Sequence, residues 1–269
     1  MTELKYPVLL VHGTLFRDTD FFCYWGRIPK ALRRAGCKVY LSLQDSNGTV
    51  EHNGEFLCRR IKTILCDSGA EKLNVIAFSK GGLDMRYVIS SMGMSRYIAS
   101  LTTISTPHNG SKTMDLMLEK HPYLMTLFSV CSDFCMSALG DEKPEAYKVY
   151  KLLSTDGARE FNEKNPDMPG VYYQSFAFTF KTNFSDVLLS VPHSFIKHIE
   201  GEIDGLVTPE NAAHGNFRGV YHGVGNRGIS HLDAIDFRRL PLSHKKGKGI
   251  YDITAFYILI AKDLQKRGF

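Results

Sequence analysis

Residues 74–82, Asn-Val-Ile-Ala-Phe-Ser-Lys-Gly-Gly, limit the fold of this chain more than any other segment. An apolar run typical of a buried strand stops at Ser79 and continues at once into a pair of glycines. This order predicts a nucleophile elbow, a sharp strand-to-helix turn that holds a serine hydroxyl at the top of a sheet. Ala77 and Gly81 flank the serine where a larger side chain would clash with the backbone as it folds back. An ordinary strand followed by a glycine-rich turn gives the same short pattern, so its meaning depends on the rest of the chain.

Strand and helix patterns alternate along most of the sequence, which predicts an α/β fold with a mostly parallel sheet covered by helices on both faces. At 269 residues and 43% hydrophobic content, the chain fits one large domain better than two small ones. Strands are expected at residues 6–11, 38–43, 73–78, 100–105 and 172–180, and helices at residues 24–34, 54–68, 82–91 and 251–266.

Residues 111–167 break this alternation with a long, helical, methionine-rich stretch that follows a core strand. These residues could pack onto the core, or they could form a helical lid inserted over an active site. Functional segments are often insertions carried by a rigid scaffold, which favours the lid. We therefore expect one domain over residues 1–269 with a lid at about residues 111–167.

Composition excludes several classes of protein. The net charge of +5 comes from scattered positive residues and not from one basic face, so nucleic-acid binding is not expected. No apolar run approaches the ~20 residues that span a bilayer, and no signal-peptide pattern opens the chain. The six cysteines form no CxxC pair and suggest neither a zinc site nor a disulfide framework. These points favour an intracellular protein, although a chain that had lost a leader would look the same.

A serine becomes a good nucleophile only when a base takes its proton and an acid orients that base. In hydrolases with an elbow the chain order is serine, then Asp or Glu, then histidine. Asp204 lies in a glycine-punctuated loop that suits an acid presented from a strand end, and His231 lies in a later loop with room for one strand between them. We therefore predict a triad of Ser79, Asp204 and His231. The rivals are His214 and His222 for the base, and Glu202 and Asp186 for the acid.

The tetrahedral intermediate of such a reaction needs two preorganised backbone N–H donors, the oxyanion hole. One donor is expected from Lys80, the residue after the nucleophile. The other is expected from the loop that ends the first central strand, at Thr14. Only the backbone of Lys80 is needed, and its side chain is expected to lie in solvent.

Several blocks of sequence together resemble the bacterial true lipases, the triacylglycerol lipases of the α/β-hydrolase fold. They occur in the family's order at residues 8–14 (VLLVHGT), 24–36 (YWGRIPKALRRAG), 77–82 (AFSKGG), 86–88 (RYV), 105–111 (STPHNGS), 204–207 (DGLV) and 231–233 (HLD). The resemblance implies a carboxylic-ester hydrolase, a lipase or long-chain esterase, that forms an acyl-enzyme on Ser79 and needs no organic cofactor. It also implies a lid that contacts a lipid–water interface, where flexible methionines suit varied acyl chains.

Other functions stay open on the same residues. An acyltransferase, a phospholipase or a thioesterase would use the same triad with a different acceptor or leaving group. A non-catalytic binding scaffold is also conceivable, but it would have no need to keep all three triad residues.

The resemblance also implies a structural calcium ion close to the catalytic histidine. Asp233 matches one ligand position, and the second acidic ligand is expected upstream of the acid loop, where the chain offers Asn183 and Asp186. An amide ligand expected after the histidine block is replaced near Phe237. The competing interpretation is that Asp233 hydrogen-bonds the histidine loop.

Overall fold

The computed structural model describes residues 2–19, 22–180, 186–225, 227–243 and 247–269. Six strands form one sheet in the order β2-β1-β3-β4-β5-β6, and each neighbouring pair is parallel. The mostly parallel sheet predicted from the sequence is therefore confirmed. The strands are β1 (Val8–Val11), β2 (Val39–Leu41), β3 (Leu73–Phe78), β4 (Ile98–Ile104), β5 (Tyr172–Phe178) and β6 (Asn216–Tyr221).

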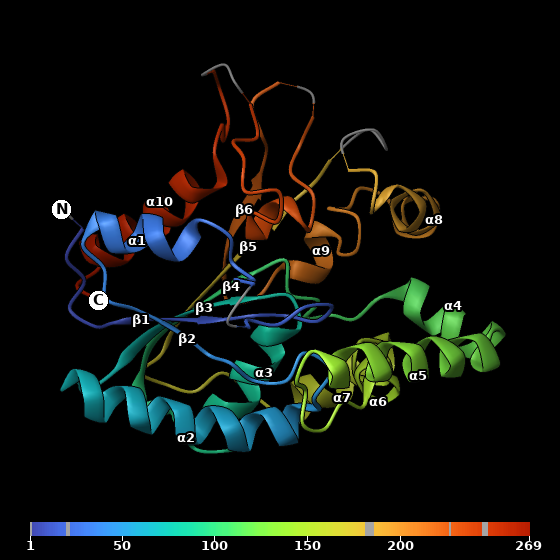
Figure 1. Ribbon diagram of the computed structural model, residues 1–269, viewed down its shortest axis with the longest axis horizontal. Coiled ribbons are helices and arrows are strands. Elements are labelled where there is room, and N and C mark those ends of the chain that lie inside the picture. The colour runs from blue at the N-terminus through green and yellow to red at the C-terminus, as the bar shows by residue number, and fades with distance from the viewer. Residues whose placement is uncertain (1, 20–21, 181–185, 226, 244–246) are drawn as a thin grey trace.

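Helices cover both faces of the sheet (Figure 1). Helices α1 (Ile28–Ala35) and α10 (Ile253–Lys266) pack together on one face, and α2 (Val50–Ser68) and α3 (Lys80–Ile89) on the other. Side chains alternate along each strand, so Val8 and Leu10 join one apolar cluster while Leu9 and Val11 join the other. This burial on both faces explains why the central strands read as continuous apolar runs.

Helix α2 begins at Val50, four residues earlier than the sequence pattern predicted. Its N-cap is Thr49, whose side chain accepts a hydrogen bond from the backbone N–H of His52. The predicted start, Gly54, lies inside the helix. A Cβ there would lie 2.9 Å from the ring of Tyr87, so the glycine lets α2 and α3 approach closely.

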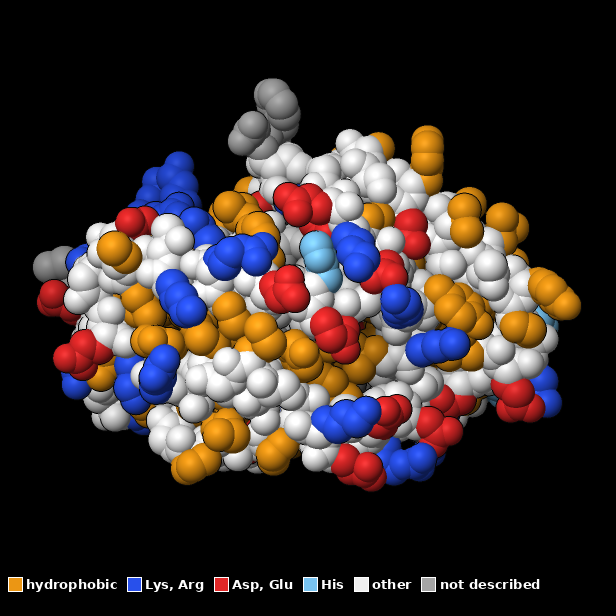
Figure 2. All heavy atoms as spheres, turned by 90° about the horizontal axis from the view of Figure 1, so that it is seen from below, with side chains coloured by type: hydrophobic (Ala, Val, Ile, Leu, Met, Phe, Trp, Pro, Cys, Tyr) orange, Lys and Arg blue, Asp and Glu red, His pale blue; other side chains and the backbone are white. Residues whose placement is uncertain are grey.

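Four helices fill the segment predicted as a lid: α4 (Lys112–Lys120), α5 (Pro122–Ala138), α6 (Ala146–Leu152) and α7 (Thr155–Lys164). They gather at one end of the sheet, where α4 contacts α8 (Ser190–Glu200), a helix that the sequence analysis did not anticipate. Apolar side chains reach the surface at this end of the molecule (Figure 2). On α5, Met125 and Met136 are buried, whereas Tyr123 is 90% and Phe134 76% exposed.

The remaining short elements are α9 (Pro209–Ala212) and the 3-10 helices η1 (Ser95–Tyr97) and η3 (Asp233–Ile235). Within the described part of the chain, no helix combines the length and the apolar character that crossing a bilayer requires.

Candidate active site

Ser79 lies between the end of β3 and the start of α3, at the sharp turn that the sequence predicted. Its φ of 52° and ψ of −132° are unusual for a residue with a side chain, and such strain collects at functional sites. Gly81 explains why a small residue is needed beside the turn. A Cβ there would lie 2.3 Å from the carbonyl oxygen of His12 and 2.7 Å from that of Val11.

The predicted acid and base meet in the structure. Nδ1 of His231 lies 2.8 Å from Oδ2 of Asp204, and the His231 backbone N–H donates to the Asp204 carbonyl oxygen at 2.7 Å. The other carboxylate oxygen accepts from the backbone N–H groups of Leu206 and Val207. Both side chains are buried. This geometry favours the tautomer in which Nδ1 carries the proton and Nε2 has a free lone pair, as a general base requires.

The predicted base, His231, also lies close to the elbow. The ring of His231 contacts that of Phe78, the residue before Ser79, with a centroid separation of 4.4 Å. Strand β6 occupies the interval between the acid and the base, as the sequence allowed. The acid differs in one respect from the expectation, because Asp204 follows helix α8 and not the end of a strand.

The rival residues have other partners. His214 pairs with Asp167 at 2.9 Å and stacks on His108, and His222 lies 3.4 Å from the Thr179 hydroxyl. Of the rival acids, Glu202 is exposed, and Asp186 accepts a hydrogen bond from the Ser230 hydroxyl.

Two backbone N–H groups are available near Ser79. Lys80 is the first residue of α3, where N–H groups lack acceptors within the helix and the helix dipole favours negative charge. The Gly13 N–H donates to the Tyr24 hydroxyl at 3.2 Å, whereas that of Thr14 has no acceptor among the described residues. A Cβ on Gly13 would lie 2.7 Å from Cβ of Ser79, so this loop approaches the serine closely.

The expectation of a solvated Lys80 side chain is wrong. The side chain is 1% exposed, and Nζ lies 2.7 Å from Oδ1 of Asp84, one helical turn further along α3. Asp84 also accepts from Asn53 on α2 at 3.0 Å. The spacing of Lys80 and Asp84, four residues apart on a helix, indicates that the two side chains can form an ion pair. The burial of this pair against α2 could not be predicted from the spacing.

Comparison with known proteins assigns the family. A family model described as palmitoyl protein thioesterase matches residues 26–156. The chain is 30% identical over 260 residues to triacylglycerol lipase 2 of Saccharomyces cerevisiae, which takes in 91% of this chain and 74% of the yeast protein. The chain belongs to the triacylglycerol lipase family. It is a carboxylic-ester hydrolase, as the resemblance implied.

Further relatives agree with this family. A triacylglycerol lipase of Vibrio cholerae is 37% identical over 117 residues, which are 43% of this chain and 37% of the bacterial protein. The Staphylococcus hyicus lipase has a TM-score of 0.69 at 17% identity and covers 98% of this chain and 97% of its own. A metagenomic carboxyl esterase has a TM-score of 0.74 at 16% identity. The match covers 98% of this chain and 76% of the esterase chain. These structures confirm the α/β-hydrolase fold.

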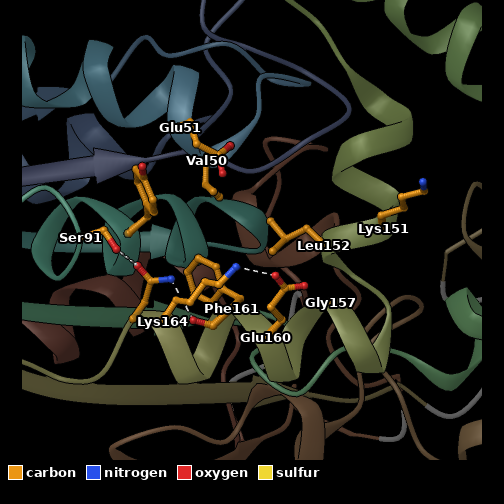
Figure 3. Close-up of a pocket in the computed structure, with 11 residues that line it drawn as sticks. Val50, Glu51, Ser91, Lys151, Leu152, Gly157, Glu160, Phe161 and Lys164 are labelled. Carbon is orange, nitrogen blue, oxygen red and sulfur yellow. Dashed lines mark hydrogen bonds and ion pairs between the residues drawn. The ribbon is translucent and has the colours of Figure 1, made fainter.

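Figure 3 shows the residues that line a cavity of about 270 Å³ in this lipase-family chain. Its apolar lining comes from Val50, Tyr87, Leu152 and Phe161, between the start of α2, the far half of α3 and helices α6 and α7. Two lysines and two glutamates surround this lining, and Lys164 pairs with Glu160. None of its residues is Ser79, Asp204 or His231, so burial of a substrate ester there would not bring it to the serine.

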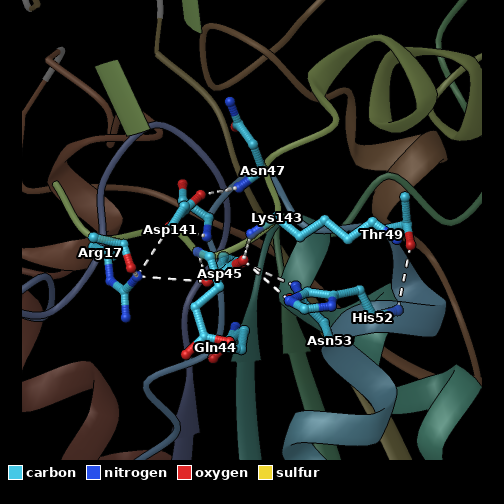
Figure 4. Close-up of polar contacts among 12 residues, drawn as sticks. Arg17, Gln44, Asp45, Asn47, Thr49, His52, Asn53, Asp141 and Lys143 are labelled. Carbon is cyan, nitrogen blue, oxygen red and sulfur yellow. Dashed lines mark hydrogen bonds and ion pairs between the residues drawn. The ribbon is translucent and has the colours of Figure 1, made fainter. Parts of the chain in front are cut away.

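Two aspartates attach the far end of α5 to the core, and we call Asp45 and Asp141 the reciprocal clamp (Figure 4). Asp45, in the loop after β2, accepts from the backbone N–H groups of Glu142 and Lys143 at 3.0 and 2.7 Å. Asp141, just after α5, accepts from two backbone N–H groups in the loop after β2. These belong to Ser46 and Asn47, at 3.0 and 2.9 Å.

Side chains support the clamp. Arg17 lies 3.5 Å from Asp45 and 3.3 Å from Asp141. Asn53, which contacts Asp84, also donates to the backbone carbonyl of Asp45 at 2.9 Å. A continuous set of hydrogen bonds therefore joins the residue after the proposed nucleophile to the end of α5. His52 is half-buried, and its Nε2 lies 3.1 Å from Oδ2 of Asp45.

The structure brings the two acidic residues proposed for calcium near one another but gives them other partners. Ser230 donates its hydroxyl hydrogen to Asp186 and its backbone N–H to Asp233. Arg227 and Arg238 both donate to the Asp233 carboxylate, whose side chain is 2% exposed. Burial raises the pKa of Asp233 to about 6, and the charge of Arg227 opposes this shift.

A calcium ion in a protein takes six to eight oxygen ligands. The described residues contain no group of three His, Cys, Asp or Glu side chains placed to hold a metal, and Asn183 lies outside them. With two guanidinium groups against Asp233, the residues present do not fit a calcium ion.

Proposed function

We propose that this chain hydrolyses long-chain carboxylic esters, including triacylglycerol, with Ser79 as nucleophile, His231 as base and Asp204 as the acid that orients the base. One observation carries the proposal: a buried His231–Asp204 pair whose imidazole packs on the residue before a serine in a strained elbow. The yeast and bacterial relatives named as triacylglycerol lipases support the choice of substrate.

The reaction then proceeds in two halves. His231 takes the proton of Ser79 as its oxygen attacks the ester carbonyl, and the protonated imidazole is stabilised by Asp204. The N–H groups of Thr14 and Lys80 stabilise the oxyanion. His231 gives its proton to the departing alcohol, which leaves an acyl-enzyme. Water activated by His231 then releases the fatty acid. None of these steps uses an organic cofactor.

Helices α4 to α7 act in this proposal as the lid, and its surface supports a contact with a lipid–water interface. Exposed apolar side chains crowd α5, and a second set lies at the start of α8. Large apolar side chains exposed in a group mark sites of interaction with proteins, membranes or ligands. The residues are Tyr123, Leu124, Leu127, Phe128, Val130 and Phe134 on the lid, with Val187, Leu188, Val191 and Phe195 beside it.

The test is hydrolysis of p-nitrophenyl esters from acetate to palmitate and of emulsified triolein, compared between wild type and Ser79→Ala. We expect activity on long chains and triolein that the folded variant lacks. A fluorophosphonate probe should label the wild type and leave the variant unlabelled. Hydrolysis by the variant at the wild-type rate would rule out Ser79 as the nucleophile.

A thioesterase is the second candidate, because a palmitoyl protein thioesterase model matches residues 26–156. Thioesters and oxygen esters pass through the same acyl-enzyme, so the triad serves both. Rates on a palmitoylated cysteine peptide and on p-nitrophenyl palmitate separate them. A kcat/KM higher by tenfold or more on the peptide would favour the thioesterase.

A further inference from the structure

We propose that Arg227 and Arg238 hold the loop that carries His231 in position, in the role that the family resemblance assigned to calcium. The inference rests on the proposed function, because it makes the two arginines positioning residues for the catalytic base. It follows from the contacts of Asp233, two residues beyond that base.

The loop around His231 closes on itself. The Ser230 N–H donates to Oδ2 of Asp233 at 3.2 Å, and the Asp233 N–H donates to Oγ of Ser230 at 3.1 Å. These two hydrogen bonds join Ser230, the residue before His231, to Asp233, two residues after it. On its other side, the backbone N–H of His231 is fixed to the Asp204 carbonyl oxygen. The position of the imidazole therefore depends on where the Asp233 carboxylate is held.

Two guanidinium groups hold that carboxylate. Nη2 of Arg227 lies 3.1 and 2.8 Å from its two oxygens, and Nη2 of Arg238 lies 2.6 Å from Oδ1. Arg227 also donates to the Leu242 carbonyl oxygen at 3.4 Å, so it ties the histidine loop to a third segment. Arginine keeps its charge at any ordinary pH and presents several donors in a fixed plane, which suits this bridging task.

The same contacts leave little for a cation to bind. Asp186 accepts from the Ser230 hydroxyl through Oδ2 and from the Leu188 and Leu189 N–H groups through Oδ1. The Asp233 oxygens face two positive charges, one from each arginine. A divalent ion would have to displace an arginine, and it would meet the repulsion of the other. The arginines and the metal are therefore alternatives at this place.

The first experiment needs no activity. The melting temperature of the wild-type protein is measured with millimolar calcium and with excess EGTA, and calcium binding is measured by calorimetry. We expect equal melting temperatures and no heat of binding. A higher melting temperature with calcium, or a lower one with EGTA, would overturn the proposal whether or not the protein hydrolyses esters.

The second experiment separates positioning from folding. The variants are Arg227→Ala/Arg238→Ala and, as a matched control, Arg159→Ala, which removes an exposed arginine from an ion pair on α7. Turnover on a soluble short ester is expressed per serine titrated with fluorophosphonate, so that unfolded protein is not counted. We expect the double variant to lose about ten- to a hundredfold in kcat with KM within about twofold, because small displacements of a catalytic group cost this much. The control should match wild type.

Conservative and milder changes complete the test. Arg227→Lys/Arg238→Lys keeps both charges, and we expect its kcat to lie between those of the alanine variant and wild type. If the double alanine variant does not fold, Arg238→Gln removes one guanidinium and gives the same comparison. Wild-type kcat per titrated serine in a folded variant without the guanidinium groups would refute the positioning role.

Discussion

Nζ of Lys80 and Oδ1 of Asp84 lie 2.7 Å apart, and each side chain is only 1% exposed. Burial raises the pKa of Asp84, and the neighbouring Lys80 charge opposes the rise. Removing one partner of a buried pair leaves an uncompensated charge, which costs about 3–5 kcal/mol. We expect Asp84→Leu and Lys80→Met each to lower the free energy of unfolding by an amount of this order, and the double variant to recover most of the loss. Urea denaturation of the four proteins measures the coupling, and two single variants that each lost under about 1 kcal/mol would contradict it.

Buried His108 predicts a loss of stability in mild acid. Burial, with the charges of His214 and Arg86, lowers its pKa well below 6.5. Arginine can only donate, so Nδ1 of His108, 3.3 Å from Arg86, is the acceptor, and Nε2–H donates to the Thr103 hydroxyl at 2.9 Å.

The sign follows from which state binds the proton. Below pH 6.5 the unfolded chain protonates this histidine and the folded chain does not. The stability that neutral His108 gives the folded protein is therefore complete above pH 6.5 and is lost as the pH drops. One proton changes the free energy of unfolding by at most about 1.4 kcal/mol per pH unit. Melting temperatures between roughly pH 8 and pH 5 should fall less steeply for His108→Gln than for wild type. His121→Gln, at an exposed position, is the control and should keep the wild-type slope.

Gly13→Ala should remove activity with a smaller effect on folding. A Cβ at this position would lie 2.7 Å from Cβ of Ser79, 3.1 Å from the Phe78 carbonyl oxygen and 3.2 Å from the Tyr24 hydroxyl. The serine or the Thr14 N–H must shift to make room. We expect kcat to fall by about a hundredfold or more. Ester hydrolysis close to the wild-type rate would mean that this loop does not supply the oxyanion hole.

The reciprocal clamp predicts where the chain becomes sensitive to protease. Asp141→Ala leaves the N–H groups of Ser46 and Asn47 without their acceptor, at a cost of about 1–3 kcal/mol for each buried donor. We expect faster limited proteolysis within residues 111–167, with cut sites mapped by mass spectrometry. Asp156→Ala, which removes an exposed ion pair on α7, is the control. Equal cleavage rates in both variants would show that the clamp does not restrain the lid segment.

Asp204→Asn tests the tautomer of the base. An amide at this position can present its NH₂ group to Nδ1 of His231, which then leaves the proton on Nε2. We expect kcat to fall by roughly a thousandfold or more, with little change in melting temperature. The measurement is turnover per titrated serine, and a fall of less than tenfold would argue for a different acid.

The sequence predicted the parts of this structure that depend on local pattern. The parallel strands, the elbow at Ser79 and the interval between Asp204 and His231 follow from apolar runs, small residues and chain order. Helix α8 was missed, although it contains the apolar residues Val191 and Phe195 and is preceded by Leu188. These apolar residues face outward at this end of the molecule, so a pattern of core burial could not reveal them.

Side-chain contacts that only the folded loop creates were harder to predict. The partners of Asp233 come from six residues before it and five after it, and only the folded loop brings Arg227 and Arg238 to the same carboxylate. The alternative that Asp233 hydrogen-bonds the histidine loop describes the geometry found. An intracellular location, the lid and the roles of the triad residues stay predictions.

The reciprocal clamp also determines how α5 could move. Asp141 follows the C-terminal end of α5, while Pro122 at the other end lies 17 residues of helix away. At 1.5 Å per residue, α5 is about 25 Å long, and the clamp holds its C-terminal end. A rotation of only about 20° around the clamp would move the Pro122 end, together with α4, by about 9 Å. A spectroscopic label near Tyr123 would therefore report opening with the largest signal, while one near Ala138 would barely move.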